Sequence, residues 1–298
     1  MPLQAALIHC PAGGSASEES HARAAALLAE RYDLRVYTCE AGGDPAALAR
    51  QALADGAELL VAQGGDGTTS AVASALVGTQ ASLGVIPAGT ANSIAGHLGI
   101  PRDVEGACAV ILAGHERVVD TSIANGRTMV LLAAMGLHAA AIVEADPARK
   151  RRLGPLAYLI EAVSQAMNTA PFEVEMVVDG VTHRVAACAV TIANMAPRTT
   201  ILAQGPEKIV DDDGQLDVTL VHYEGFGEAV VTALHLATRA LSESEADREN
   251  IGHFQAREIK VTPASPQILM IDGEAHDAAE LHVVSRPRSL RVRAPAEA

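Results

Sequence analysis

The feature that most constrains this chain is a glycine-rich run, Gly64-Gly65-Asp66-Gly67-Thr68, placed between two different kinds of element. Residues 58–62 form an apolar run typical of a buried strand, and residues 69–77 have the pattern of a helix. The run therefore lies where a strand ends and a helix begins. Glycines there let backbone N–H groups approach an anion closely, and the helix start adds partial positive charge. These residues predict a phosphate-binding loop.

Asp66 is unexpected in a loop that only binds anions, because its carboxylate would repel phosphate. Its presence is explained if a divalent cation bridges the carboxylate and the phosphate groups. An ordinary strand-to-helix turn is the alternative interpretation, but glycines on both sides of an aspartate exceed what such a turn needs. The loop therefore predicts nucleotide-dependent phosphoryl transfer.

The first 120 residues alternate strand and helix patterns, which is typical of a mostly parallel sheet. Strands are predicted at residues 5–10, 34–39, 58–62 and 82–87, and helices at residues 17–31, 45–54 and 69–77. The strand at 82–87 runs into a second polar loop, Ala88 to Ser93. Right-handed crossovers would place both loops at the same sheet edge. We expect residues 1–120 to form an α/β nucleotide-binding domain, and packing of the chain's C-terminal end back onto it stays open.

Residues 121–298 have a different pattern, in which short strands predominate. Asn125-Gly126 and Asp179-Gly180 each lie between apolar runs, which is a strong signal for a two-residue hairpin. Later strands are predicted at residues 216–222, 258–262, 267–271, 281–285 and 289–293. Helices are expected only at 156–167 and near 227–241. The second domain is therefore predicted to be mainly antiparallel.

Charge and cysteine content narrow the class of protein further. The net charge of −14 argues against nucleic acid, whose phosphates require a positive surface. The four cysteines are far apart in the sequence, so neither a disulfide framework nor a structural zinc site is expected. The N-terminus does not have the pattern of a signal peptide, and the apolar stretch from Met129 to Val143 is too short to span a bilayer. A cytoplasmic protein is expected, with transient contact at the inner face of the membrane left open.

Five segments, in their order and spacing, resemble the diacylglycerol kinase catalytic-domain family, in particular the bacterial lipid kinases related to sphingosine kinases. Each segment alone is weak evidence, since GGDGT also occurs in NAD kinases and phosphofructokinases. The resemblance covers nearly the whole chain. Its segments are Pro11 to Gly14, Gly64 to Thr68, Pro87 to Asn92, Lys150 to Tyr158 and, in the second domain, Asp212 to Val218 together with Asp272-Gly273-Glu274.

The resemblance implies an α/β nucleotide-binding domain, a C-terminal antiparallel β-sandwich, and ATP- and magnesium-dependent phosphorylation of a lipid hydroxyl. It makes Glu274 the proton acceptor for a diacylglycerol-like or sphingoid alcohol and gives Asp66 a catalytic role. A structural Mg²⁺ would be held by the carbonyls of Val210 and Gln215 and the carboxylate of Asp213. The implied nucleotide contacts are Gly14, Thr38, Gly64, Gly65, Gly67, Thr68 and Thr90.

The chain departs from the family pattern at several positions. Ser70 and Ala71 stand where the family usually has Asn-Glu, Ser93 stands where it has Asp, and Cys10 stands where it has Asn. Two acidic groups are therefore missing, which leaves two other functions open. One is a NAD kinase-like phosphotransferase, and the other is a non-catalytic relative that binds nucleotide or lipid.

Simpler interpretations also stay open for single residues. Thr90 and Asn92 could cap the following helix, Asp213 could form an Asx-turn, and Glu274 could be a solvated hairpin residue. The basic run from Arg149 to Arg152 is either a solvated loop or a contact for phosphates or lipid headgroups. The sequence does not indicate the oligomeric state.

Overall fold

The computed structural model describes residues 2–10, 18–40, 42–136, 171–197, 209–224 and 249–296, together with 200, 203, 228, 231, 232, 235 and 239. The chain forms two compact units. Unit 1 comprises Met1–Thr121 and Arg286–Ala298, and unit 2 comprises Ser122–Ser285. Several predictions fall outside the described residues, namely those on Gly14, on Lys150 to Tyr158, on the basic run at Arg149 to Arg152, and on the helix at 156–167 with most of the one near 227–241.

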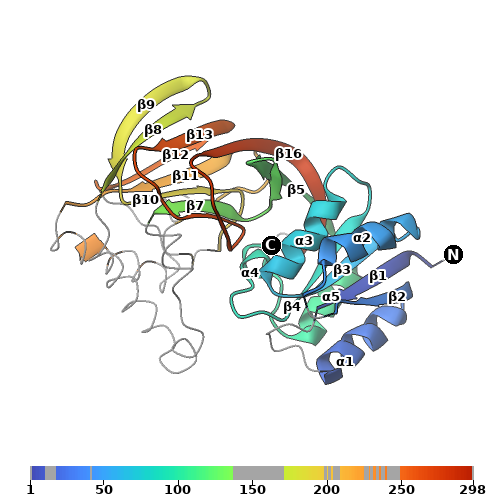
Figure 1. Ribbon diagram of the computed structural model, residues 1–298. Helices are drawn as coiled ribbons and strands as arrows, with labels where there is room; N and C mark the ends of the chain where they lie inside the picture. The colour runs from blue at the N-terminus through green and yellow to red at the C-terminus, as the bar shows by residue number, and fades with distance from the viewer. Residues whose placement is uncertain are drawn as a thin grey trace. The chain divides into compact units, whose positions relative to one another are not determined.

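Unit 1 is a parallel sheet with helices on both faces (Figure 1). Its strand order is β2-β1-β3-β4, and the end of β16 pairs with β4. Helices α2 and α3 pack together, as do α1 and α5, which gives one pair of helices to each face. The elements are β1 (Gln4–His9), α1 (Glu18–Ala29), β2 (Asp33–Thr38), α2 (Pro45–Ala54), β3 (Leu59–Gly64), α3 (Asp66–Leu76), β4 (Ser82–Pro87), α4 (Ser93–His97) and α5 (Val104–Ala113).

Burial along the central strands explains this arrangement. Every residue of β3 and of β4 is buried, as expected for parallel strands that are covered on both faces. Side-chain caps define where two helices begin: the Asp44 carboxylate accepts the N–H of Ala46 at the start of α2, and Asp103 accepts that of Gly106 at the start of α5. Because β1 pairs in parallel with both β2 and β3, the carboxyl ends of these three strands lie side by side.

Strand β16 (Leu281–Arg293) was predicted as two separate strands, but the structure has one. Pro287 and Arg288 interrupt the strand pattern in the sequence, and Arg288 has a φ of 50°. The N–H of Arg288 is nevertheless satisfied, because it donates to a carboxylate oxygen of Asp120 at 2.6 Å. The prediction of two strands is therefore wrong.

Unit 2 contains two antiparallel sheets. One has the order β12-β11-β10-β7-β14-β15, and the other continues from the start of β16 through β13 and β8 to β9. The strands are β5 (Glu116–Ala124, which begins in unit 1), β6 (Arg127–Met129), β7 (Leu132–Gly136), β8 (Phe172–Val178), β9 (Val181–Ala187), β10 (Ala189–Ala193), β11 (Leu216–Val221), β12 (Ile251–Ala256), β13 (Glu258–Pro263), β14 (Leu269–Ile271) and β15 (Glu274–His276).

Alternate residues of these strands form one apolar core. Val190 and Ile192 of β10 belong to the same buried cluster as Ile259 and Val261 of β13, so both sheets contribute. This is the packing of a β-sandwich. The fold class predicted from the sequence, an α/β unit followed by an antiparallel sandwich, is confirmed.

The two hairpins predicted from Asn-Gly and Asp-Gly are also present. Asn125-Gly126 joins β5 to β6 with φ values of 47° and 79°, and Asp179-Gly180 joins β8 to β9 with 46° and 85°. Positive φ at both central residues is the signature of a type I′ turn. Among the described residues, no helix combines the length and the apolar character needed to cross a bilayer.

Candidate functional site

The start of α3 provides backbone donors at the end of β3. The helix begins at Asp66, three residues earlier than the sequence indicated, so the second half of the glycine-rich run is its first turn. Gly65 is the N-cap residue and supplies no side-chain cap, while the N–H of Thr69 bonds the Gly65 carbonyl at 3.0 Å. The N–H groups of Asp66, Gly67 and Thr68 therefore have no intrahelical acceptor and suit an anion.

The two predicted phosphate loops lie in contact within unit 1. A methyl group on Gly89 would lie 2.5 Å from the Cα of Gly65, and one on Gly64 would lie 2.6 Å from the Thr68 side chain. Glycine is therefore required by close packing at Gly64 and Gly89. The loops meet because β3 and β4 pair in parallel up to Gly64 and Pro87.

Close packing does not explain the glycine at position 67. A Cβ placed there would have no atom within 4 Å, and the φ of Gly67 is not in the left-handed region. Neither packing nor backbone conformation in the described structure requires a glycine at this position. The open space above Gly67 is where a phosphate could approach the helix start.

Asp66 connects the two loops. One of its carboxylate oxygens accepts the N–H of Ile94 in α4 at 3.0 Å. Its other oxygen has no hydrogen-bond partner among the residues that the structure describes, and the side chain is half-buried. One half of the carboxylate therefore fixes α4, and the other half is available to a cation.

Asn92 holds the second loop closed and has a role that sequence reasoning missed. It has a φ of 54°, its Oδ1 accepts the N–H of Gly89, and its Nδ2 donates to the Gly89 carbonyl, both at 2.8 Å. Asn92 occupies the N-cap position of α4, as the sequence left open, but its side chain makes no cap bond to that helix. Thr90 lies exposed in this closed loop.

Polar residues also gather at the ends of β1 and β3. The rings of His9 and His21 stack with centroids 4.2 Å apart, and Gln63 is fully buried with its amide bonded to His21 Nδ1 at 2.9 Å and to Ser20 Oγ at 3.3 Å. Burial, and secondarily the neighbouring His21, lowers the pKa of His9. These contacts fix α1 against the strand ends. The signal that could have found them is a polar residue at the last positions of two buried strands.

The expectation about cysteines is wrong for one pair. Cys10 follows β1, Cys39 follows β2, and the structure joins them in a disulfide with their Cα atoms 4.8 Å apart. A separation of 29 residues in the sequence is no obstacle, because β1 and β2 are neighbours in the sheet. Thr38, a predicted nucleotide contact, lies exposed directly before Cys39.

In unit 2, Asp272-Gly273 forms a third type I′ hairpin, with φ values of 48° and 88°, and pairs Ile271 with Glu274. The Asp272 carboxylate accepts three backbone N–H groups from the segment before β7, those of Val130 and Leu131 at 2.8 Å and that of Leu132 at 3.2 Å. Asp272 is therefore an anchor for the turn.

Glu274 is the first residue of β15 and is exposed. Among the described residues its carboxylate has no hydrogen-bond partner, so it is free to accept a proton from a substrate. Asp66 belongs to unit 1 and Glu274 to unit 2, and the expectation that they act on one substrate stays a prediction.

The Asp213 turn has the Asx geometry that the sequence left open. Asp213 Oδ1 accepts the N–H of Gln215 at 2.9 Å, and Oδ2 accepts Gln255 Nε2 at 3.0 Å. Within the described ranges no three His, Cys, Asp or Glu side chains form a metal cluster. A carboxylate oxygen has lone pairs beyond one hydrogen bond, so Asp213 with the carbonyls of Val210 and Gln215 is an oxygen-only set compatible with Mg²⁺. That metal assignment stays a prediction.

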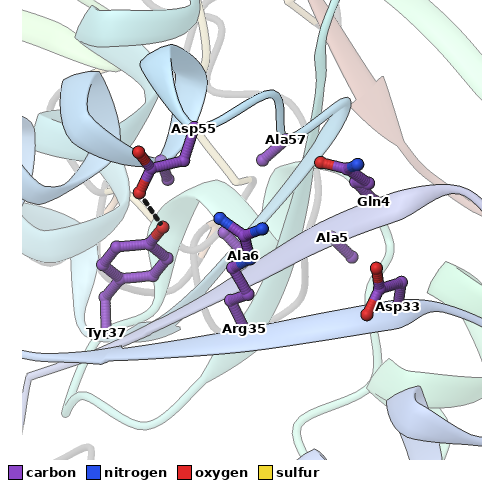
Figure 2. Close-up of a pocket in the computed structure, with 9 residues that line it drawn as sticks. Gln4, Ala5, Ala6, Asp33, Arg35, Tyr37, Asp55 and Ala57 are labelled. Atoms are coloured by element: carbon purple, nitrogen blue, oxygen red, sulfur yellow. Dashed lines mark hydrogen bonds between the residues drawn. The ribbon is translucent and has the colours of Figure 1, made fainter.

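A small hollow elsewhere in unit 1 carries no sign of a site (Figure 2). It lies beside the first three residues of β1, along β2 from Asp33 to Tyr37, and at the end of α2. The Tyr37 hydroxyl bonds Asp55 at 2.8 Å there, and burial, with the Asp55 contact next, raises the pKa of Tyr37. The hollow has room for about one water molecule.

Comparison with known proteins agrees with this geometry. Residues 4–124 match the diacylglycerol kinase catalytic domain, and residues 132–294 match the YegS C-terminal NAD kinase beta sandwich-like domain. Diacylglycerol kinase of Bacillus subtilis is 28% identical over 275 residues, covering 89% of this chain and 87% of that enzyme. Diacylglycerol kinase of Staphylococcus aureus strain RF122 is 27% identical over 303 residues, covering 99% and 93%.

Another relative, an uncharacterized protein of Synechocystis, is 40% identical over 82% of this chain, but the chain spans only 56% of that protein's length. A solved structure of a diacylglycerol kinase from Bacillus anthracis superposes with a TM-score of 0.75 at 19% identity, covering 98% of this chain and 97% of that one. At this identity, the superposition shows the fold alone.

The fold is an α/β unit followed by a β-sandwich unit, and the family matches support a kinase at the level of the family. The chain belongs to the diacylglycerol kinase catalytic-domain family and carries the YegS type of C-terminal domain. The resemblance stated from the sequence is confirmed.

Proposed function

We propose that this protein transfers the γ-phosphate of ATP to the hydroxyl of a diacylglycerol-like or sphingoid lipid. The observation that carries the proposal is the start of α3, where three backbone N–H groups, the open space at Gly67 and one free oxygen of Asp66 lie together. Phosphoryl transfer mainly requires positioned donors and neutralised charge, which this arrangement supplies.

Each of the two loops at the carboxyl ends of β3 and β4 has a distinct role in this proposal. The first turn of α3 binds phosphate oxygens, and Asn92 keeps the second loop shaped around Gly89 so that Thr90 is presented to the nucleotide. Asp66 would hold a Mg²⁺ that, when bound, would neutralise charge on the phosphates, and the Asp213 turn would hold a separate, structural Mg²⁺.

Glu274 would accept the proton of the lipid hydroxyl. An alcohol is a weak nucleophile, and a positioned carboxylate that takes its proton accelerates such a step by about 100- to 10,000-fold. The Asp272 anchor supports this role, because three backbone bonds fix the turn from which Glu274 projects.

The test is an acceptor panel with the full chain, labelled ATP and Mg²⁺. The panel contains a diacylglycerol, a long-chain base with its amino alcohol, a monoacylglycerol and NAD. Labelled lipid phosphate is expected with at least one lipid alcohol and none with NAD. Transfer to NAD would replace the proposal with the NAD kinase-like alternative. No transfer to any acceptor, with ATP binding intact by calorimetry, would identify a non-catalytic relative in which Ala71 and Ser93 replace needed carboxylates.

A further inference from the structure

Cys10 and Cys39 lie at the edge of the sheet that the proposed function uses. They follow the last paired residues of β1 and β2, His9 and Thr38, and the structure joins them in a disulfide. Their Cα separation of 4.8 Å is within the range of about 4.4–6.8 Å that disulfides require. The spacing of the two strand ends is therefore compatible with a disulfide.

The remaining cysteines are chemically different. Cys108 in α5 and Cys188 beside β10 are both free and fully buried. Burial raises the pKa of the Cys108 thiol to about 11 and also raises that of Cys188. Because the thiolate is the reactive form, both are poor partners in thiol–disulfide exchange. Cys10 is half-buried and Cys39, although buried, lies directly beside it, so exchange should begin at Cys10 and end in the Cys10–Cys39 pair.

The disulfide is connected to the start of the glycine-rich run through backbone bonds. The N–H of Cys10 donates to the carbonyl of Gln63 at 3.4 Å, and Gln63 directly precedes Gly64. The N–H of Cys39 donates to the carbonyl of His9 at 2.8 Å. The bridge therefore joins the carboxyl ends of β1 and β2 covalently, and a backbone hydrogen bond connects Cys10 to the end of β3. If these strand ends are already held in place, nucleotide binding loses less conformational entropy in ordering them.

We propose that Cys10 and Cys39 are a reversible thiol–disulfide site, oxidised by a small disulfide of the glutathione type, and that the bridged form binds nucleotide more tightly than the reduced form. The second half of this proposal rests on the proposed function.

The exchange balances without a further oxidant. One cysteine thiolate attacks the small disulfide, forms a mixed disulfide and releases one small thiolate. The second cysteine thiolate then attacks the protein sulfur of the mixed disulfide and releases the other. Two protein thiols become one disulfide, and the small disulfide, which takes up the two electrons, becomes two thiols.

The first experiment counts thiols. The full chain is equilibrated in buffers of reduced and oxidised glutathione, quenched with acid, alkylated and weighed by mass spectrometry. We expect two of the four cysteines to become protected together, with peptide mapping linking Cys10 to Cys39. Cys10→Ser and Cys39→Ser should each stop at a mixed disulfide, while Cys108→Ser, the matched control, should behave like wild type. Failure of the pair to link, or linkage to Cys188, would overturn the proposal.

The second experiment measures Mg²⁺ with a non-hydrolysable ATP analogue by calorimetry, on oxidised and reduced chain. The bridged form is expected to bind about fivefold more tightly, and the Cys10→Ser/Cys39→Ser double variant should bind like the reduced form in either buffer. A thermal melt of the double variant checks that it is folded. Equal affinity of the two forms would overturn the coupling alone. Failure of both forms to bind nucleotide would overturn the proposed function as well. The first experiment, the thiol count, would still test whether Cys10 and Cys39 form a disulfide.

Discussion

Asp66 and Asp272 look alike in the sequence, since each stands beside a glycine at the end of a buried strand, but the structure uses them differently. Asp66 is in the first turn of a helix and commits one oxygen to a backbone N–H, which leaves the other available. Asp272 is in a left-handed turn conformation and accepts three backbone N–H groups. An aspartate in a glycine turn is therefore informative about chemistry only where its carboxylate is not already occupied by the backbone.

The Asp272 hairpin also has a counterpart without a proposed function. Asp179-Gly180 is a type I′ turn whose Asp179 Oδ1 accepts the N–H groups of Arg257 and Glu258 at 3.0 and 2.9 Å. There the residue after the glycine is Val181, whereas in the Asp272 hairpin it is Glu274. The two turns use the same backbone device, and only the residue that each one presents differs.

The largest expected effect is on the residue that the Asp272 hairpin presents. Glu274→Gln should lower turnover by about 100- to 10,000-fold, because the amide cannot accept the proton of the alcohol. Steady-state assays with the best lipid acceptor measure this, and a thermal melt should be unchanged because Glu274 is exposed. Asp277→Asn, a neighbouring exposed carboxylate, is the matched control. Near-wild-type turnover of Glu274→Gln would remove Glu274 from its role.

A stability measurement tests whether Asp272 is an anchor. Asp272→Ala should lower the free energy of unfolding by about 2–4 kcal/mol, since three N–H groups lose a charged acceptor. Asp179→Ala should lose less, because two N–H groups are involved. Denaturant unfolding compares the two variants. A smaller loss for Asp272→Ala than for Asp179→Ala would contradict the difference drawn between the hairpins.

Asp66→Asn separates the two halves of the Asp66 carboxylate. The Asn oxygen can still accept the Ile94 N–H, so the melting temperature should hold, while affinity for Mg²⁺ with nucleotide falls about tenfold because the charge is lost. Calorimetry with and without Mg²⁺ measures this, and the difference between variant and wild type should vanish without the metal. Unchanged affinity in Mg²⁺ would refute the cation bridge.

Gly67→Ala tests the open space at the helix start. The added methyl group meets no described atom, so stability should be kept, but nucleotide affinity should fall about threefold as the methyl obstructs phosphate. Gly252→Ala is the matched control, because its methyl would make only an ordinary 3.7 Å contact with Leu220 in unit 2. Tighter binding by Gly67→Ala would show that phosphate does not approach there.

The smallest effect is on pH dependence. The pKa of His9 is lowered by burial from its ordinary value of 6.5, so below pH 6.5 the unfolded chain binds more protons at this position than the folded chain. Its contribution to stability is therefore complete above pH 6.5 and declines as the pH falls below that value. Melting temperatures across this range should fall less steeply for His9→Gln than for wild type. His183→Gln, at an exposed position on β9, should melt like wild type, and identical slopes for all three would reject the assignment to His9.

Several local features were predictable because they depend on residues close in the sequence. The Asn125-Gly126 and Asp179-Gly180 turns follow from the low energy of those pairs at positive φ, and the glycine-rich run follows from its place between a strand and a helix. The boundary of α3 was misplaced by three residues. Asp66, Gly67 and Thr68 do not favour helix strongly, and the absence of a side-chain cap at Gly65 leaves no signal for its start.

The sequence by itself determined the fold class, the glycine-rich connection between a strand and a helix, and the Asn125-Gly126 and Asp179-Gly180 turns, because each rests on apolar periodicity or on backbone preferences of adjacent residues. Only the tertiary structure decided the anchoring of Asp272 by residues 130–132, the closure of the second loop by Asn92, and the pairing of Cys10 with Cys39. The Asp272 and cysteine contacts join residues 140 and 29 positions apart, and all three depend on precise atomic positions. Folding brings such groups together, and the periodicity of the sequence does not indicate which groups will meet.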